Sequence, residues 1–344
     1  MSKPLSICIL RLSAIGDVCH TLAVVQAILG HYPNAQIDWI IGKTEASLLQ
    51  GVPNINFIPY DKKSGWKGIF TLWQQLKHKR YDFLLNLQTA FRASILSLGI
   101  KADKKIGFNK DRAREGQWLF TNQKVEQTAS PHVLDGQMMF AKAIGVTDLT
   151  PSWHLPISEE DLAVGAGFID KSRQNVVIAP CSSKKEKDWL PERYAEIANF
   201  LTACGVNVII AGSPSAYEMQ TAAKIQELAP NCLNCAGKTT LKQLAGLIQQ
   251  ADLVISSDSG PAHIATTQHT PVIGLYAIHN PRRTGPYQDL DKVVSVYDEA
   301  ILQTYGKPWQ ELPWATKAKG ENLMANISVD MVKQKVLASL GLNV

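Results

Sequence analysis

The sequence predicts an α/β protein with two domains, each built around a parallel sheet, and three observations support this fold class. Apolar strand-like segments alternate with helical segments twice along the chain, a pattern typical of parallel sheets. A stretch rich in proline and acidic residues separates the two series near residues 150–160. The length of 344 residues is sufficient for two domains with one hydrophobic core each.

The first series begins with a buried-strand pattern at 6–12, followed by a turn at Gly16 and Asp17. A helix is expected over about 18–29, ending before Pro33. Further strands are expected where short apolar or β-branched runs occur, at 37–41, 55–60 and 82–87. Helical patterns cover 66–79 and 131–145.

The second series follows the segment TPSWHLPISEED, whose prolines and acidic residues suggest a linker and a helix start. One helix, 191–205, has proline in its first turn and glycine at its end. The strands are expected at 175–180, 206–212, 252–260, 271–276 and 292–297, and the other helices at about 215–229, 241–251 and 328–340. We therefore expect domains at 1–155 and 156–325, and a final helix in 326–344 that packs back on the N-terminal domain.

Charge is distributed unevenly between the two halves. Residues 1–150 contain 18 Lys and Arg against 11 Asp and Glu, whereas residues 151–344 contain 17 against 19. A basic half suggests contact with an anion such as a phosphate, a nucleic acid or an anionic lipid, and the alternative is an ordinary solvated surface.

Signals for export or membrane insertion are not seen. The N-terminal apolar run SICIL is too short for a signal peptide, and no window approaches the ~20 apolar residues of a membrane span. The pair Cys232 and Cys235 forms a lone CxxC, and without a second pair we interpret the six cysteines as reduced, small apolar residues. The protein is therefore expected in the cytoplasm.

Three polar loops follow expected strands, at the edge where open α/β sheets bind ligands. In the first, Gly16 lets the backbone approach a ligand closely, and Asp17 stands at a helix start. Asp17 is either a general base or only a helix cap. The loop lacks the pattern GxGxxG, which disfavours a dinucleotide-dependent oxidoreductase.

The second loop, 182–189, contains serines and lysines suited to a diphosphate, and its alternative is a solvated charged loop. We expect Trp189 to anchor the next helix rather than to bind a ligand. The third loop, 257–263, is expected to open a helix, and the N–H groups and positive dipole end of that helix would stabilise a diphosphate without a metal. Ser259 lacks the GxSxG context of a hydrolase nucleophile.

Together, the three loops resemble the lipopolysaccharide heptosyltransferases of glycosyltransferase family 9, and the likeness extends over nearly the whole chain. The family pattern (K/R)xSxxGD followed by HTL is matched by Arg11, Ser13, Gly16, Asp17 and His20-Thr21-Leu22. The second motif is matched by Ser182, Ser183, Lys187 and Trp189, and the third by Asp258, Ser259, Gly260 and His263. The short segment Ala113-Arg114-Glu115 makes the likeness strongest to heptosyltransferase I.

This resemblance implies the GT-B fold, two Rossmann-like domains facing across a cleft. It implies an inverting transfer of heptose from ADP-heptose to the Kdo sugar of Kdo-lipid A, without a metal or other cofactor. Asp17 would be catalytic. The implied donor residues are Ser182, Ser183, Lys187, Glu218, Thr239, Asp258, Ser259, Gly260 and His263. The implied acceptor residues are Ser13, Gly16, Lys62, Lys63, Lys67 and Arg114.

Three departures from the family pattern stand out. Lysines 62, 63 and 67 occupy the place of an arginine-rich acceptor loop, and lysine lacks the bidentate fork of arginine. Glu218 is displaced by about half a turn from the ribose-binding carboxylate, and Thr239 is smaller than the methionine of one branch. The segment 279–287 has no assigned role.

The sequence also allows two other functions. Heptosyltransferase II, with a heptose acceptor, is the alternative within the family, and a non-catalytic nucleotide-binding protein is the alternative outside the enzymes. We expect a monomer at the cytoplasmic face of the inner membrane, in peripheral contact with that membrane and without a nucleic-acid partner.

Overall fold

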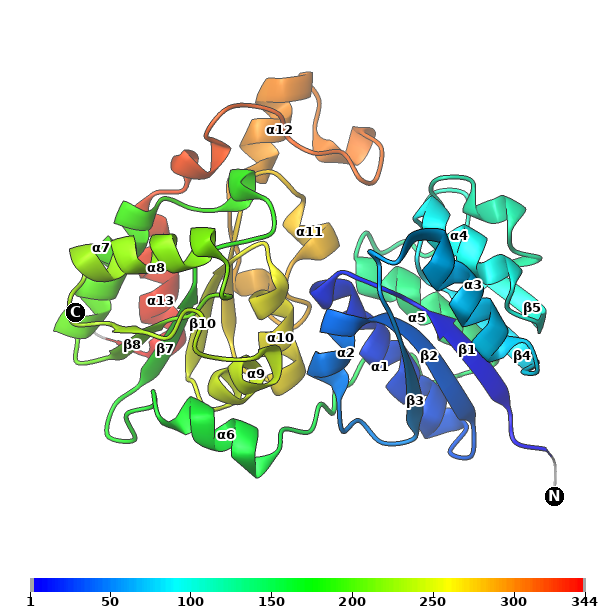
Figure 1. The fold of residues 1–344 in the computed structure, drawn as a ribbon. Helices are drawn as coiled ribbons and strands as arrows, with labels where there is room; N and C mark the ends of the chain where they lie inside the picture. The colour runs from blue at the N-terminus through cyan, green and yellow to red at the C-terminus, as the bar shows by residue number, and fades with distance from the viewer. Residues whose placement is uncertain (1–2, 343–344) are drawn as a thin grey trace. The chain divides into compact units, whose positions relative to one another are not determined.

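The computed structural model describes residues 3–342, and the chain divides into two compact units, Met1–Leu155 and Pro156–Val344. Each unit contains one six-stranded sheet in which every pair of neighbouring strands is parallel. Helices join the strands in both units (Figure 1). The α/β class predicted from the alternation of segments is therefore confirmed.

The sheet of the first unit has the order β3-β2-β1-β4-β5-β6. Its strands are β1 (Ser6–Leu10), β2 (Gln36–Gly42), β3 (Ile55–Tyr60), β4 (Tyr81–Asn86), β5 (Ala102–Gly107) and β6 (Gln123–Lys124). The helices are α1 (Ile15–His31), α2 (Lys43–Leu49), α3 (Gly65–Leu76), α4 (Phe91–Leu98), the 3₁₀ turn η1 (Gln117–Leu119) and α5 (Val133–Ala143).

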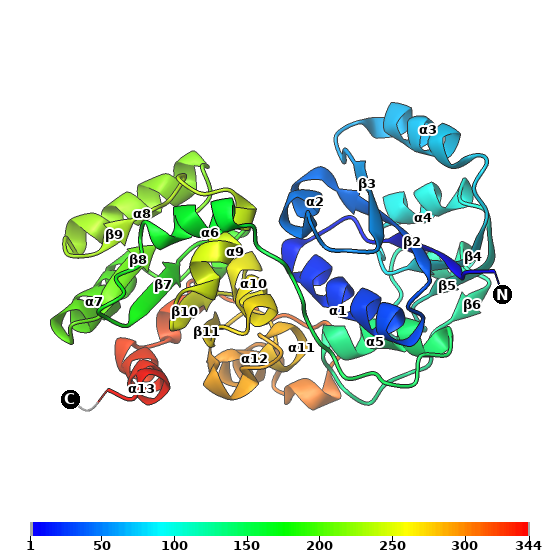
Figure 2. The ribbon, with the colours of Figure 1, turned by 90° about the horizontal axis from the view of Figure 1, so that it is seen from below.

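The two faces of this sheet are covered by different helices. Cys8 and Leu10 of β1 belong to a core cluster with Leu72 of α3 and Leu96 of α4, so these helices cover one face. Figure 2 shows α1 and α5 on the other face, where they pack against each other. Because β1 is central, the loop after it lies at the middle of the carboxyl edge, where β2 and β4 also end.

The sheet of the second unit has the order β12-β11-β10-β7-β8-β9. Its strands are β7 (Asn175–Ala179), β8 (Asn207–Ile210), β9 (Leu233–Asn234), β10 (Leu253–Ser257), β11 (Val272–Tyr276) and β12 (Val294–Ser295). The helices are α6 (Glu159–Ala166), α7 (Pro191–Ala203), α8 (Ala216–Leu228), α9 (Leu241–Gln249), α10 (Gly260–Gln268), α11 (Pro281–Thr284), α12 (Tyr297–Tyr305) and α13 (Val329–Leu340). Short 3₁₀ turns are η2 (Lys185–Lys187), η3 (Leu290–Lys292), η4 (Trp309–Glu311) and η5 (Leu323–Asn326).

The last helix corrects one prediction. This helix was expected to pack on the N-terminal domain, but α13 (red in Figure 1) packs against α7, β11 and β12 of the second unit. The reason is its apolar stripe, because Val332 and Val336 are fully buried in the core that also contains Ile197 of α7 and Ile273 of β11. The helix completes the second hydrophobic core.

Trp189 anchors the helix that follows it, as predicted. Its indole is 2% exposed, packs edge-on against Tyr194 of α7, and donates to the carbonyl of Ile327 at 3.0 Å. The cysteines are all free thiols, and burial raises the pKa of Cys235 to about 11. These groups contribute to packing at neutral pH.

Candidate active site

The loop between β1 and α1 is fixed by hydrogen bonds from its backbone. The N–H groups of Leu12 and Ser13 both donate to Gln88 Oε1, at 3.0 and 3.2 Å. The N–H of Gly42, at the end of β2, donates to the carbonyl of Leu12 at 3.0 Å. The loop is thus held on both sides, by residues that follow β4 and end β2.

Asp17 lies in the first turn of α1 and makes two local contacts. Its carboxylate accepts from the N–H of Ala14 at 3.2 Å, and it forms an ion pair with the guanidinium of Arg11. The side chain of Arg11 is 9% exposed, whereas that of Asp17 is 33% exposed. Asp17 therefore caps the helix and still presents its carboxylate to solvent, so capping and a role as base are compatible.

The segment His20-Thr21-Leu22 has a packing role in this unit. The Thr21 hydroxyl lies 2.8 Å from Gln137 Oε1 of α5, and His20 packs edge-on against His132 at the start of α5. Both side chains on α1 are buried. These residues join α1 to α5 and so support the position of Asp17.

Loops that follow β3, β4 and β5 bring the expected acceptor residues near one another. Arg92 of α4 donates to the carbonyl of Lys62, and Glu115 accepts from the N–H of Phe91 at 2.6 Å. These two contacts connect the loop that contains Lys62 to the loop that contains Arg114. Arg114 is exposed beside Glu115, as an acceptor ligand requires.

Lys62 differs from the other expected acceptor residues. Its ammonium lies 2.8 Å from Glu45 Oε1, and the Glu45 side chain is only 6% exposed. Lys62 therefore neutralises a buried carboxylate, whereas Lys63 and Lys67 are exposed at the start of α3. Ser13 is half-buried and Gly16 is buried in the loop before α1.

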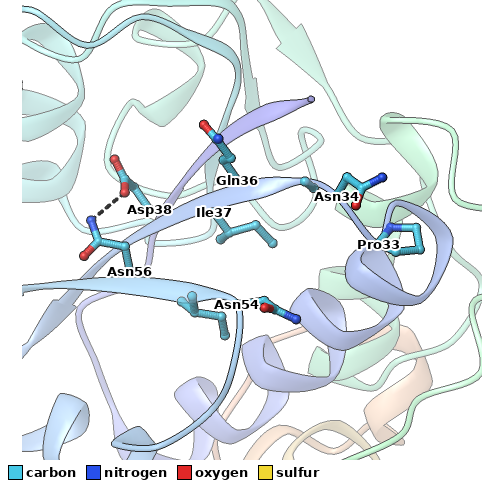
Figure 3. Close-up of a pocket in the computed structure, with 9 residues that line it drawn as sticks. Pro33, Asn34, Gln36, Ile37, Asp38, Asn54 and Asn56 are labelled. Carbon is cyan, nitrogen blue, oxygen red and sulfur yellow. Dashed lines mark hydrogen bonds between the residues drawn. The ribbon is translucent and has the colours of Figure 1, made fainter. Parts of the chain in front are cut away.

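A recess of about 620 Å³ lies elsewhere in the first unit. Residues at the starts of β2 and β3 line it, and Asn56 donates to Asp38 within it at 2.6 Å (Figure 3). Strand starts lie at the opposite edge of the sheet from the Asp17 loop. The recess is therefore not part of the predicted site.

In the second unit, a network around Asp188 shapes the loop after β7. The Asp188 carboxylate accepts from the Ser182 N–H at 2.6 Å and from the Tyr217 hydroxyl at 2.9 Å. The Ser182 hydroxyl donates to the carbonyl of Lys184 at 2.7 Å, while Ser183 is exposed. Ser182 thus holds the loop, and Ser183 is the serine available to a ligand.

Lys187, Asp258 and His279 meet where three neighbouring strands end. They follow β7, β10 and β11, which are adjacent in the sheet. Lys187 Nζ lies 3.1 Å from Asp258 Oδ2, and His279 Nδ1 lies 2.5 Å from the same oxygen. Lys187 also donates to the Asp258 carbonyl. Lys187 and Asp258 were predicted from the sequence as site residues, whereas His279 had no predicted role.

Electrostatics keep the Asp258 carboxylate ionised. Burial raises its pKa, but the hydrogen bond from His279, the positive charge of Lys187 and the charge that His279 carries when protonated outweigh burial and hold the pKa at about 2. His263, which is buried on α10, also favours the charged form. An ionised Asp258 fixes the position of Lys187 beside the start of α10.

Helix α10 begins at this cluster. Ser259 is its N-cap residue, but the Ser259 side chain does not cap the helix and lies 3.1 Å from Ser256 Oγ instead. Gly260 opens the helix, and a glycine here lets a ligand approach the backbone closely. The partial positive charge of the helix start and the ammonium of Lys187 make this edge suitable for a diphosphate.

Glu218 and Thr239 lie on two further loops of this unit. The Glu218 carboxylate accepts from the Ser213 N–H at 2.7 Å and from the Ser213 hydroxyl at 2.6 Å. Thr239 is half-buried directly before the N-cap of α9. Because Gly237 N–H donates to the carbonyl of Gly212 at 2.9 Å, these loops are side by side, after β8 and β9.

Comparison with known proteins decides the family. Residues 69–315 match the description "Glycosyltransferase family 9 (heptosyltransferase)". The chain belongs to glycosyltransferase family 9. This family 9 protein is 60% identical to the lipopolysaccharide core heptosyltransferase OpsX of Haemophilus influenzae over 330 residues, 96% of this chain and 95% of the relative.

Solved structures show that the fold is shared. A family 9 glycosyltransferase from Veillonella parvula gives a TM-score of 0.78 at 23% identity, covering 98% of this chain and 97% of its own. Heptosyltransferase WaaC from Escherichia coli, solved with ADP, gives 0.74 at 18% identity, covering 97% and 100%. The predicted GT-B fold class and the resemblance to family 9 are confirmed.

Proposed function

We propose that this family 9 protein is an inverting heptosyltransferase that transfers L-glycero-D-manno-heptose from ADP-heptose to the Kdo of Kdo-lipid A. The observation that carries the donor assignment is the ion pair of Lys187 and Asp258 beside the start of α10. Support also comes from OpsX, named as a lipopolysaccharide core heptosyltransferase, and from WaaC, whose structure contains ADP.

The chemistry needs one base and one set of positive groups. Asp17 takes the proton of the acceptor hydroxyl while that oxygen attacks C1 of the heptose. The bond between C1 and the phosphate oxygen breaks, and ADP leaves with the electron pair. Lys187, Ser183 and the N–H groups at the start of α10 hold the leaving diphosphate. Attack opposite the leaving group inverts the anomeric centre.

No metal is needed in this proposal, because an ammonium and a helix start replace the cation usually found on a diphosphate. Within residues 3–342 no group of three or more His, Cys, Asp or Glu side chains is placed to hold a metal ion. Activity that persists in EDTA is the expected result, and activity that requires added Mg²⁺ or Mn²⁺ contradicts the proposal.

The acceptor assignment rests on the basic loops of the first unit. Arg114 is suited to the Kdo carboxylate, because guanidinium binds carboxylates bidentately. Lys63 and Lys67 provide further positive charge on the loop and helix that follow β3. A heptose acceptor, as used by heptosyltransferase II, is the alternative, and a nucleotide-binding protein without turnover is disfavoured because binding alone does not require Asp17.

Exposed apolar side chains on the same loops support contact with the lipid surface that carries the acceptor. Trp66, Phe91 and Trp118 are 62%, 51% and 50% exposed, and each follows the carboxyl end of a strand. Aromatic side chains next to lysines and arginines are typical of peripheral attachment to anionic membranes. None of the helices formed by residues 3–342 is long and apolar enough to cross a membrane.

The test of the proposed function is a transfer assay with purified protein, ADP-heptose and Kdo-lipid A. Mass spectrometry is expected to show an acceptor that has gained one heptose, together with released ADP. Hydrolysis of ADP-heptose without acceptor modification, or binding without turnover, contradicts the proposal.

A further inference from the structure

The two ring nitrogens of His279 differ in their hydrogen bonding. Its Nδ1 lies 2.5 Å from Asp258 Oδ2, and its side chain is 14% exposed. Among the residues that the structure describes, no hydrogen bond to Nε2 is found. The imidazole stands at the edge where Lys187 and the start of α10 form the proposed diphosphate site.

The hydrogen bond to Asp258 determines which nitrogen carries the proton. With a pKa of about 2, Asp258 is ionised at neutral pH, and a carboxylate only accepts hydrogen bonds. Nδ1 must therefore carry a proton and donate it. The two N–H directions of an imidazole diverge, so Nε2 faces away from Asp258. A neutral His279 thus offers an unprotonated Nε2 at this edge.

We propose that His279 is a third diphosphate ligand, which takes up a proton at Nε2 when ADP or ADP-heptose binds and donates it to a phosphate oxygen. This inference rests on the proposed function, because it assumes that the donor's diphosphate occupies this edge. The proton comes from solvent, and no covalent bond changes. An added phosphate charge favours the imidazolium, which Asp258 already stabilises from the other side.

Some of the neighbouring charged and titratable groups favour protonation of the His279 ring, and others oppose it. Asp258 favours the protonated ring, whereas Lys187 after β7 and His263 on α10 oppose it when charged. Tyr276 on β11, whose pKa burial raises well above its ordinary value, stays neutral. Arg283 follows His279 by four residues, and Lys317 is nearby because Ala318 N–H donates to the carbonyl of Ile278 at 3.0 Å.

The negative charge that favours the imidazolium on binding comes with the phosphates of the ligand. The proposal therefore predicts that uptake depends on the phosphates of the ligand and not on adenosine. Two substitutions separate the two ring nitrogens. His279→Asn keeps a short amide donor that can reach Asp258 but lacks a group at Nε2. His279→Gln places an amide near Nε2 that cannot take up a proton.

The experiment is isothermal titration calorimetry of ADP at pH 7.5 in Hepes and in Tris, whose ionisation heats differ, so the apparent enthalpies report protons exchanged. Wild-type protein is expected to take up more protons per ADP than either variant, and His279→Asn is expected to bind ADP about 10-fold more weakly or worse. Adenosine binding should be the same in all three. His78→Gln, an exposed histidine in the first unit, serves as the matched control.

The outcomes separate this inference from the proposed function. Equal proton exchange in wild-type protein and in both variants overturns the role of His279 as a protonated ligand, even if affinity falls, because a structural role explains the affinity alone. A wild-type protein that does not bind ADP removes the donor site and with it the proposed function. Thermal unfolding of each variant identifies any loss that comes from folding.

Discussion

Lys187 Nζ lies 3.1 Å from Asp258 Oδ2, so an ion pair joins the loop after β7 to the loop after β10. Both side chains are largely buried, at 12% and 10% exposure. The ion pair with Asp258 fixes the position of the Lys187 ammonium beside the start of α10, where it can bind a phosphate.

Replacing Lys187 by alanine is expected to weaken ADP binding by about 10- to 100-fold, because a charged hydrogen bond to phosphate is lost. Lys184→Ala and Lys185→Ala are the matched controls in the same loop. Both side chains are exposed, and Lys185 lies over the Tyr217 ring at 4.1 Å. Calorimetric titration with ADP measures all three variants. Equal losses would indicate a diffuse basic loop instead of a specific ligand.

Asp17→Asn is expected to lower turnover by about 10²–10⁴-fold, the usual cost of losing a general base, while ADP affinity stays unchanged. An asparagine side chain still accepts from the Ala14 N–H, so the helix cap is retained in this variant. Steady-state rates and ADP titrations are the measurements. A variant that keeps more than about a tenth of the wild-type rate would show that Asp17 is only a cap.

For the acceptor, Arg114→Ala is expected to raise the acceptor KM by about 10-fold, and the double variant Lys63/Lys67→Ala to raise it less, because lysines lack the bidentate fork. ADP affinity should not change. Lys62→Ala is the contrasting variant, since Lys62 pairs with the nearly buried Glu45 and its loss should lower the unfolding temperature. Acceptor kinetics that are unchanged in Arg114→Ala and in the double variant leave the basic loops without a role in acceptor binding.

Acid stability follows from Asp258. Its pKa falls from an ordinary 3.8 to about 2 in the folded protein, so its contribution is present above pH 4 and is lost as the pH falls towards 2. The shift corresponds to about 2 kcal/mol of unfolding free energy. Urea unfolding at pH 5, 4 and 3 should show a shallower decline for Asp258→Asn than for wild-type protein or for the exposed control Asp291→Asn. Parallel declines contradict the assigned pKa.

Much of the fold could be predicted because its strands are short, apolar and fully buried. Strands β1, β7, β10 and β11 all match predicted segments, since a sheet covered on both faces requires continuous apolar runs. The strand β5 was missed because its sequence, ADKKIG, carries three charges that the structure leaves exposed or half-buried. The predicted strand at 292–297 is only the two residues of β12, because Tyr297 starts α12.

The positions of site residues could be predicted where polar residues follow such strands. Their individual roles could not, because those roles depend on which side chains meet in the folded protein. Lys187 and Asp258 are 71 residues apart, and their pairing follows from the adjacency of β7 and β10. Lys62 was predicted as an acceptor ligand, but its partner Glu45 is on α2, a helix of seven residues that the sequence analysis missed. His279 follows the end of an apolar strand, which is the same sequence signal that identified the other loops. It could therefore have been predicted as a site residue.

The most direct test of the central claim is a competition between two acceptors. Wild-type protein is supplied with ADP-heptose, Kdo-lipid A and Kdo-lipid A that already carries one heptose, in EDTA, and the products are separated by mass spectrometry. The account predicts that Kdo-lipid A is depleted and that the acceptor with one heptose, which is also its product, increases by the same amount, while no species with two heptoses forms. Transfer to the heptosylated acceptor alone, or no transfer to either, would contradict it.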